Sequence, residues 1–422
     1  MRDRQIDAVE VIDQHSDSKQ EGDSPAAARR VIYIDISFSR HSTTISTASN
    51  FMQQDSLQTL VAQEAVKAGF STAGIAAVPE SDSTEDKNER RAFADWVEQG
   101  NAGEMEYLKR CNDAGELVRS SLRVAVPWAK SVVVCAANYN TQQPLSTDLA
   151  QEGAGWIARY AWSGRQIGDG GLAPSDYHKV LLKRLEQLNT ALKDKLGTFE
   201  SKCYVDTGPI VERAYARYAG LGWTGKNTCI LNQKLGSWLF LGVILTSLEV
   251  PDDQRPQLAA DRCGSCTRCI DACPTVALTS PRQMDATLCI SYLTIEKRGP
   301  ISLELREGIG RQVFGCDICQ DVCPWNRKAP ISADPELQAR SELVNPALDW
   351  LAELNQESFG QMFFGSPIKR AKFDGLRRNI AIAMGNSRSR RFLPKLEEWR
   401  QGDDPVLAEA AGWAIRQVEN EV

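Results

Sequence analysis

Two runs of closely spaced cysteines constrain this 422-residue chain more than any other feature. The first run reads Cys263-x2-Cys266-x2-Cys269-x3-Cys273-Pro274, which is the spacing that ferredoxins use for a cubane iron–sulfur cluster. In such a run three thiolates from one loop face one cluster, and the fourth cysteine opens the next helix and faces a second cluster. The spacing therefore predicts a unit that holds two clusters and transfers single electrons.

The second set of cysteines repeats the same ending. It consists of Cys289 and the run Cys316-x2-Cys319-x3-Cys323-Pro324. Because the last cysteine of each run faces away from its neighbours, we expect each run to lend one ligand to the other cluster. Cluster one is expected to take Cys263, Cys266, Cys269 and Cys323, and cluster two Cys273, Cys289, Cys316 and Cys319. The alternative is a pair of four-thiolate zinc sites, which the shared x3-Cys-Pro ending disfavours.

Composition indicates a cytoplasmic globular protein. The chain has 12 Cys and only 3 His, which disfavours histidine-rich zinc or non-haem iron sites. The polar start has no apolar core of a signal peptide, and the longest mostly apolar stretch, residues 238–248, is too short to span a membrane. Clustered cysteines in a reducing compartment usually bind metal.

The order of the sequence patterns predicts an α+β fold. Residues 1–50 are polar and rich in Ser and Thr, which is typical of a disordered leader. A capped helix is expected from Asp55, where Gln58 would complete a capping box, to Gly69. Buried strands are expected at residues 131–137 and 238–248, and an amphipathic helix at 177–196.

These patterns divide the chain into segments. After the leader, residues 51–255 are expected to form the first folded domain and residues 256–335 the cysteine-rich one. Residues 336–422 read as short stacked helices of a solenoid kind. Outside the two cysteine runs, Cys135 is expected in the core, and three other cysteines show no ligand spacing: Cys111, Cys203 and Cys229.

Several long motifs resemble those of the epoxyqueuosine reductases. They are Cys-Gly-Ser-Cys-Thr-Arg-Cys-Ile-Asp-Ala-Cys-Pro-Thr (263–275), Gly-Cys-Asp-Ile-Cys-Gln-Asp-Val-Cys-Pro-Trp-Asn (315–326), Val-Asp-Thr-Gly-Pro-Ile-Val-Glu-Arg (205–213) and Gly-Leu-Gly-Trp-Thr-Gly-Lys-Asn-Thr (220–228). The resemblance extends from about residue 55 to the C-terminus. It implies a nitroreductase-like cobalamin-binding domain, a ferredoxin-like unit with two 4Fe–4S clusters and a HEAT-like helical tail.

The resemblance also implies an activity and its partners. The family reduces epoxyqueuosine at the wobble position of tRNA to queuosine, the last step of queuosine biosynthesis, with base-off cobalamin and two 4Fe–4S clusters. The implied substrate is tRNA with a GUN anticodon, and the implied electron donor is a flavodoxin or a ferredoxin. A monomeric enzyme is expected.

Matching the family motifs residue by residue gives candidate site residues. Asp206 corresponds to the proton donor, although Asp-Thr-Gly is also common in turns. Arg119 corresponds to a cobalamin-contacting arginine, whose alternative role is a surface ion pair. The cobalamin wall is expected to include Lys226 and Asn227, together with three residues beside the cluster ligands, where the corrin is expected to meet cluster one: Lys297, Asp317 and Ile318.

One departure from the family pattern lies between Arg159-Tyr-Ala and Asp176-Tyr-His. Residues 166–175 form a Gly-rich insertion beside the expected corrin site. It puts in question whether Tyr177 and His178 keep their places. A single histidine at a helix start is more often structural than a metal ligand, so we do not expect His178 to ligate cobalt.

A basic stretch in the tail is expected to hold the tRNA. The net charge is −6, yet residues 361–400 carry ten Lys or Arg and three acids. Phosphate contacts from such a stretch would supply affinity. The expected contacts are Lys369, Arg370, Lys372, Arg377 and Arg378, and the alternative is an ordinary solvated helix face.

Two other functions remain compatible with two clusters. A corrinoid reductive dehalogenase would usually carry a twin-arginine leader, and Arg29-Arg30 lacks the apolar segment that should follow it. A ferredoxin-type electron-transfer subunit would need neither Asp206 nor a corrin site. Corrin absorbance in the purified protein separates the second alternative from both enzymes.

Overall fold

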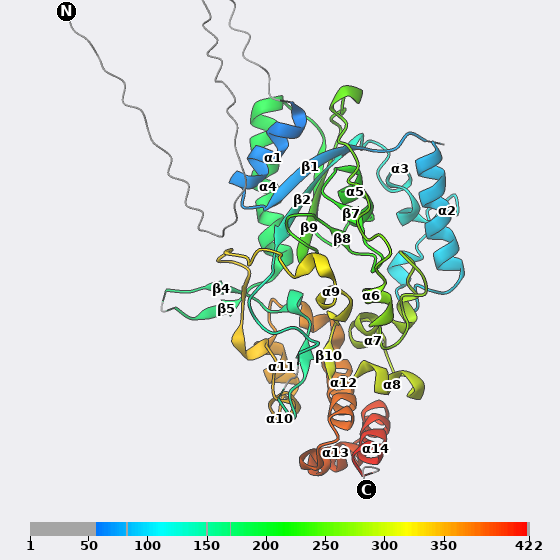
Figure 1. The fold of residues 1–422 in the computed structure, drawn as a ribbon, viewed down its shortest axis with the longest axis vertical. Coiled ribbons are helices and arrows are strands. Elements are labelled where there is room, and N and C mark those ends of the chain that lie inside the picture. Colours follow the sequence, from blue (N-terminus) through cyan, green and yellow to red (C-terminus); the bar gives the residue numbers. More distant parts are fainter. Residues whose placement is uncertain (1–55, 82, 149–150, 169, 420–422) are drawn as a thin grey trace, which may run out of the picture. The chain divides into compact units, whose positions relative to one another are not determined.

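The first half of the chain is built on a four-stranded antiparallel sheet with the order β1-β2-β9-β6 (Figure 1). The computed structural model describes residues 56–81, 83–148, 151–168 and 170–419, so the leader expected at 1–50 lies outside the described residues. The strands are β1 (Thr72–Ala77), β2 (Ser131–Asn138), β6 (Ser201–Tyr204) and β9 (Leu239–Thr246). All eight residues of β2 are buried, including Cys135, and both predicted strands are confirmed.

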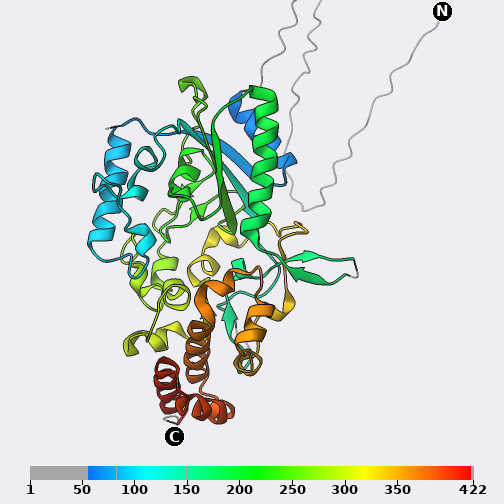
Figure 2. The ribbon, with the colours of Figure 1, turned by 180° about the vertical axis from the view of Figure 1, so that it is seen from behind.

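Helices cover both faces of this sheet (Figures 1 and 2). Helices α1 (Leu57–Lys67) and α4 (Tyr177–Leu196) pack on one face and α5 (Glu212–Tyr218) on the other. The helix predicted at 177–196 is confirmed, and the Asp176 side chain caps it by accepting from the backbone N–H of His178. The two remaining helices of this half are α2 (Thr84–Glu98) and α3 (Leu122–Ala125).

The predicted start of α1 needs a correction. Its N-cap is Ser56, whose hydroxyl accepts from the Thr59 N–H, whereas Asp55 lies outside the described residues. Gln58 closes no capping box, because its side chain bonds the backbone of Ile75 in β1. A side chain that can satisfy a neighbouring strand is thus drawn away from its own helix end.

The cysteine-rich segment is joined to the first half by strand pairing. Its strand β10 (Gln312–Phe314) pairs in parallel with β3 (Trp156–Ile157). Its helices are α6 (Arg268–Asp271), α7 (Ile290–Ile295), α8 (Leu303–Ile309) and α9 (Ile318–Asp321). A small ribbon, β7 (Trp223–Thr224) with β8 (Ile230–Leu231), packs against Cys323. The two segments therefore share one folded unit.

The Gly-rich insertion forms a hairpin that projects from the body (Figure 1). Strands β4 (Ser163–Gln166) and β5 (Leu172–Pro174) pair with each other, and β4 also pairs with β11 (Gln338–Ala339). The Ser175 N–H donates to the Ser163 carbonyl and closes the base of the hairpin. The insertion therefore leaves α4 in place, and the rings of Tyr160 and Tyr177 lie 6.2 Å apart.

The C-terminal segment is helical, as predicted. Helix α12 packs on α14 so closely that a Cβ on Gly385 would lie 2.8 Å from Ala414. No helix in the described part of the chain is long and apolar enough to cross a membrane. The helices are α10 (Leu348–Ala352), α11 (Gln356–Met362), α12 (Lys372–Asn386), α13 (Leu393–Arg400) and α14 (Pro405–Glu419).

Candidate functional site

A cavity of about 1860 Å³ lies between the sheet half and the cysteine-rich segment. Asp206 and Arg119, both expected at the site, line it, as do Tyr177 and His178. Cys289 lines it from the side of the cysteine-rich segment. The cavity thus collects a carboxylate, an arginine, phenols and a cysteine on one concave surface, which is the usual form of a cofactor site.

Asp206 lies two residues after the end of β6 and is held in an uncommon backbone conformation. Its φ is +54°, in the left-handed region that Asp tolerates better than most residues. Its side chain is exposed and accepts a hydrogen bond from the Tyr177 hydroxyl at Oδ2, at 2.5 Å. A strained, exposed carboxylate on a cavity wall fits a functional role better than a structural one.

Tyr177 is a buried hydrogen-bond donor to Asp206. It is buried at the start of α4, and its ring stacks on Phe240 with centroids 4.1 Å apart. Burial, together with the Asp206 charge, raises the pKa of Tyr177 well above its usual value. The phenol therefore stays protonated and acts as a hydrogen-bond donor to the carboxylate.

Arg119 reaches the loop that carries Asp206. It lies in the 3₁₀ turn Val118–Ser120, and its Nη1 donates to the carbonyl of Ile210 at 3.3 Å. This bond ties the arginine turn to the segment between Asp206 and α5. Arg119 is thereby placed on the cavity wall by the backbone of the same loop that positions the carboxylate.

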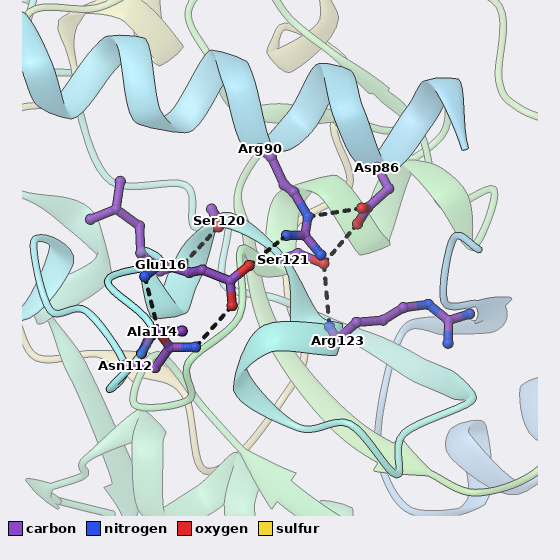
Figure 3. Close-up of polar contacts among 9 residues, drawn as sticks. Asp86, Arg90, Asn112, Ala114, Glu116, Ser120, Ser121 and Arg123 are labelled. Carbon is purple, nitrogen blue, oxygen red and sulfur yellow. Dashed lines mark hydrogen bonds and ion pairs between the residues drawn. The ribbon is translucent and has the colours of Figure 1, made fainter. Parts of the chain in front are cut away.

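A polar network, part of which lines the cavity, holds the arginine turn (Figure 3). The buried Asp86 accepts from Arg90 Nε at 2.8 Å and from the Ser121 hydroxyl at 2.7 Å. Arg90 also donates to Glu116. Asn112 Oδ1 accepts from the backbone of the same loop and closes it into a tight turn. Residues 112–121 are therefore fixed on both sides of Arg119.

Five of the predicted cofactor-wall residues do not line this cavity as the described residues define it. The Lys226 ammonium donates to the Gly264 carbonyl at 2.7 Å, and the buried Asn227 donates to the Cys319 carbonyl at 3.2 Å. Lys297 pairs with Glu104. These side chains support the cluster loops and the cavity rim. The five residues are Lys226, Asn227, Lys297, Asp317 and Ile318.

The Asp317 side chain in particular is turned away from the cavity. It is buried, and Oδ2 accepts from the Arg159 N–H at 2.7 Å and from the Trp156 indole at 3.1 Å. Its carboxylate therefore binds the backbone next to β3 and leaves no free acceptor for a cofactor at that oxygen. The prediction of a cofactor contact from the Asp317 side chain does not agree with this geometry.

Several cysteines lie near one another in the groupings that the spacing predicts, but no three of them form a metal site among the described residues, so the two ligand sets stay a prediction. Cys323 is buried in a small core with Trp223 and Leu231, and Cys263 packs against this core. Burial raises the pKa of Cys323 to about 11, so a thiolate there requires a cationic partner. In the second set, burial raises the pKa of Cys316 and the charges of Cys289 and Cys273 add to it. Both sets thus fit thiolate ligation of a metal cluster.

The second set, and not the first, borders the cavity. Cys289 is on the cavity wall, whereas none of Cys263, Cys266, Cys269 and Cys323 is among the described lining residues. The expectation that the corrin meets cluster one is therefore not supported by the geometry. The exchange of ligands between the two runs, which the sequence spacing predicts, does not tell which cluster faces the sheet half.

The basic residues of the tail differ in what they can contact. Lys369 and Lys372 are exposed, and Arg377 is half-buried over the rings of Phe373 and Trp399. Arg370 is paired with Glu296 through two contacts of 2.9 and 3.0 Å at the cavity. A basic hollow of about 480 Å³ is lined by Lys297, Arg298, Lys372 and Arg377, among others.

Arg378 is a correction to the predicted tRNA contacts. It is 2% exposed and donates to the carbonyls of Leu293, Lys297 and Gly299 at 2.7–3.0 Å. The remaining donors of the guanidinium bond Asn379 Oδ1, so Arg378 has none to offer a phosphate. It joins α12 to the end of α7 instead, and its charge must be subtracted from the basic surface.

Comparisons with known proteins agree with the resemblance seen in the motifs. A family described as "4Fe-4S double cluster binding domain" matches residues 262–326, and one described as "Epoxyqueuosine reductase QueG, DUF1730" matches residues 119–207. The epoxyqueuosine reductase of Xanthomonas campestris is 37% identical, over 83% of this chain and 93% of its own. That of Escherichia coli is 34% identical, over 85% and 88%.

Solved structures are similar as well. A selenomethionine-labelled epoxyqueuosine reductase is 28% identical with a TM-score of 0.72, covering 85% of this chain and 89% of its own. An epoxyqueuosine reductase with an epoxyqueuosine-modified tRNA-Tyr stem loop has a TM-score of 0.71 at 28% identity, with coverage of 85% and 89%. A third, from Bacillus subtilis, has its catalytic aspartate loop swung out of the active site; its TM-score is 0.70 at 28% identity, with coverage of 85% and 89%.

Sequence reasoning assigned no role to Glu212, which also lines the cavity. Its only signal was position, since it closes the Val-Asp-Thr-Gly-Pro-Ile-Val-Glu-Arg motif (205–213). Tyr177 was noted only as a residue that the insertion could displace. Both belong to the site because of contacts between segments that the sequence separates.

Proposed function

Because this chain belongs to the epoxyqueuosine reductase family, we propose that it reduces epoxyqueuosine at the wobble position of tRNA to queuosine. The observation that carries the proposal is the cavity that Asp206 lines from the sheet half and Cys289 lines from the cysteine-rich segment. A candidate proton donor and a candidate electron source thereby open onto one cavity. Reduction of an epoxide to an alkene requires both.

The cavity suits cobalamin in size and in its lining. A volume of about 1860 Å³ accommodates a corrin ring together with a nucleoside. Bound cobalamin would supply a low-valent cobalt that is strongly nucleophilic toward an epoxide carbon. Arg119 and Asp206 are the chain's own contacts to it. A base-off cofactor without a protein ligand to cobalt is proposed from the family resemblance.

Each residue of the site has one task in this proposal. Asp206 donates a proton to the departing oxygen, and Tyr177 holds its carboxylate in place. Electrons reach the cavity through the second cysteine set, after entering at the first. A flavodoxin or a ferredoxin is the proposed donor, and the enzyme is proposed to act as a cytoplasmic monomer.

The organisation of the fold is proposed to follow the family. We assign residues 51–255 as a nitroreductase-like catalytic domain, 256–335 as a ferredoxin-like unit and 336–422 as a HEAT-like tRNA-binding domain. The antiparallel sheet flanked by α4 and α5 supports the first assignment. The packing of α12 against α13 and α14 supports the last.

The tRNA is proposed to lie over the basic part of the tail, with its wobble nucleoside in the cavity. Lys369, Lys372 and Arg377 form no ion pair with any of the described residues, so their charges are available for phosphate. Arg370 pairs with Glu296 at the cavity and is proposed to contact the anticodon loop. A substrate with a GUN anticodon is expected.

Removing three of these charges should weaken tRNA binding without slowing chemistry. In the triple variant Lys369→Gln, Lys372→Gln and Arg377→Gln, we expect the KM for tRNA to rise and kcat to stay close to wild type. The salt dependence of binding should flatten by about one unit of slope for each phosphate that the variant no longer neutralises. Arg378 is left intact because its removal would unpair three buried carbonyls.

The matched control removes three lysines from α4, which lies on the sheet: Lys183→Gln, Lys193→Gln and Lys195→Gln. Both triples change the net charge equally, so a general field effect would appear in both. Binding is measured with a tRNA stem-loop across a salt series. Equal affinity and equal slope in the two triples would show that the tail residues are solvated surface.

The proposed function as a whole is tested on the anaerobically purified full chain. We expect corrin absorbance and iron–sulfur absorbance in the same preparation. Nucleoside analysis of tRNA from a strain lacking this gene should show epoxyqueuosine in place of queuosine, and expression of the chain should restore queuosine. Iron–sulfur absorbance without corrin absorbance would instead support an electron-transfer subunit.

A further inference from the structure

Glu212 is a second carboxylate on the wall of the Asp206 cavity. It is the first residue of α5 and follows Asp206 by six positions. Its Oε1 is buried, and no hydrogen-bond partner for this atom exists among the described residues. An unpaired buried carboxylate oxygen is costly for the ionised form. The chain thus retains at this position a group that favours protonation.

The charges around Glu212 come from three elements. Asp206 faces it from the loop after β6, Arg119 from the 3₁₀ turn, and Arg213 from its own helix. Burial, and then the Asp206 charge, raises the pKa of Glu212 to about 7, while the two arginines oppose this rise. The side chain therefore exchanges a proton within the physiological pH range, which is the property of an efficient proton donor.

A neighbouring carboxylate shows that such a state is not general to the cavity. Glu89 of α2 also lines it, and burial raises the pKa of Glu89 as well. Its Oε1, however, accepts from the Tyr218 hydroxyl and lies near Arg217. Glu89 is held in a hydrogen-bonded network, whereas Oε1 of Glu212 is left free to pass a proton on.

The reaction itself demands a second proton. An epoxide becomes an alkene when both C–O bonds break and a C=C bond forms, which consumes two electrons and two protons and releases water. The electrons come from the one-electron donor through the clusters. Asp206 can give one proton and is then a carboxylate, and Tyr177 cannot replace that proton because its phenol stays protonated.

We propose that Glu212 is the proton relay of this site: it reprotonates Asp206, through water in the cavity, between the two proton transfers of one turnover. The inference rests on the proposed function, since it presumes that Asp206 is the acid. Glu212 acts through Asp206 and is a positioned proton source with no contact to substrate. Its carboxyl returns to the protonated state from solvent before the next turnover.

The test replaces Glu212 with Gln in the holoenzyme. We expect kcat to fall by about 10²-fold, at the lower end of the range for loss of an acid–base group. Cobalamin content, cluster absorbance and the KM for tRNA should stay at wild-type values. Glu212→Asp restores a carboxyl one methylene shorter and should recover part of the rate. Glu186→Gln, at an exposed position of α4 that does not line the cavity, is the control and should keep wild-type kcat.

Two readouts separate a relay from a structural role. In wild type, kcat should fall as pH rises through about 7, because the relay loses its proton; Glu212→Gln should lack this descending limb. The infrared band of protonated carboxyls at neutral pH should lose the intensity of one carboxyl in Glu212→Gln, while any contribution from Glu89 and Asp317 remains, a measurement that needs no turnover.

The outcomes are distinct from failure of the function itself. A wild-type enzyme that forms no queuosine would refute the proposed function. An active wild type with an unchanged rate and pH profile in Glu212→Gln would overturn the relay alone. Loss of cobalamin from Glu212→Gln would also overturn it, because Glu212 would then be a binding residue.

Discussion

Replacing Asp206 by Asn should lower turnover by about 10²–10⁴-fold, the usual cost of losing a general acid. The substitution is close to isosteric, and its amide oxygen can still accept from the Tyr177 hydroxyl. Asn also tolerates the left-handed backbone region in which residue 206 lies, at φ +54°. The change therefore removes the proton while leaving the loop and the cavity as they are.

The measurement is queuosine formation by the purified variant, with cobalamin and cluster absorbance recorded on the same sample. Both cofactors should remain at wild-type levels. As a control, the variant Asp176→Asn alters the other acid next to Tyr177. Asp176 caps α4 and bonds His178. Near wild-type turnover by the Asp206 variant would end its assignment as the acid.

The sequence predicts well those parts of the fold that depend on neighbours in the chain. The apolar spacing from Tyr177 to Leu196 defines α4 to the residue, because a helix buries one stripe of its own side chains. The cysteine spacing likewise predicts the ligand sets, and the packing of Cys263 against the small core that contains Cys323 is compatible with that prediction. Local pattern and local geometry are the same information in these cases.

Long-range pairings could not be predicted in this way. Strand β3 has only two residues, and its partner β10 lies some 155 positions later, so neither has a periodic signal of its own. The Tyr177–Asp206 bond and the approach of Glu212 to the same cavity depend on how α4 and α5 cover opposite faces of the sheet. Such contacts belong to tertiary structure alone.

Arg378 shows the same limit for charge. Counting Lys and Arg treats every positive side chain as solvated, yet this guanidinium is buried against carbonyls of Leu293, Lys297 and Gly299. Arginine is suited to this because its planar fork presents several donors in fixed directions. A charge count over a segment therefore overstates the surface that it offers to a polyanion.

Replacing Cys323 by Ala should remove cluster one, although Cys323 is close in sequence only to ligands of cluster two. Cys323 lies in the small apolar core formed by Trp223 and Leu231, with Cys263 packed against it. Without it the first set keeps only three thiolates, so its cluster is lost or degraded. Iron content should fall from about eight to about four atoms per chain.

Two further variants test which cluster each cysteine binds. Cys316→Ala should remove the other cluster, the one whose ligand Cys289 borders the cavity. Cys111→Ser changes an exposed cysteine outside both sets and should alter neither. Electron paramagnetic resonance of the reduced proteins distinguishes which cluster remains in each variant.

If Cys323→Ala and Cys316→Ala retain the same cluster, the exchange of ligands between the two runs is wrong. If they retain different clusters, electrons must cross from the set that holds Cys323 to the set beside Asp206, and turnover should be abolished in both variants.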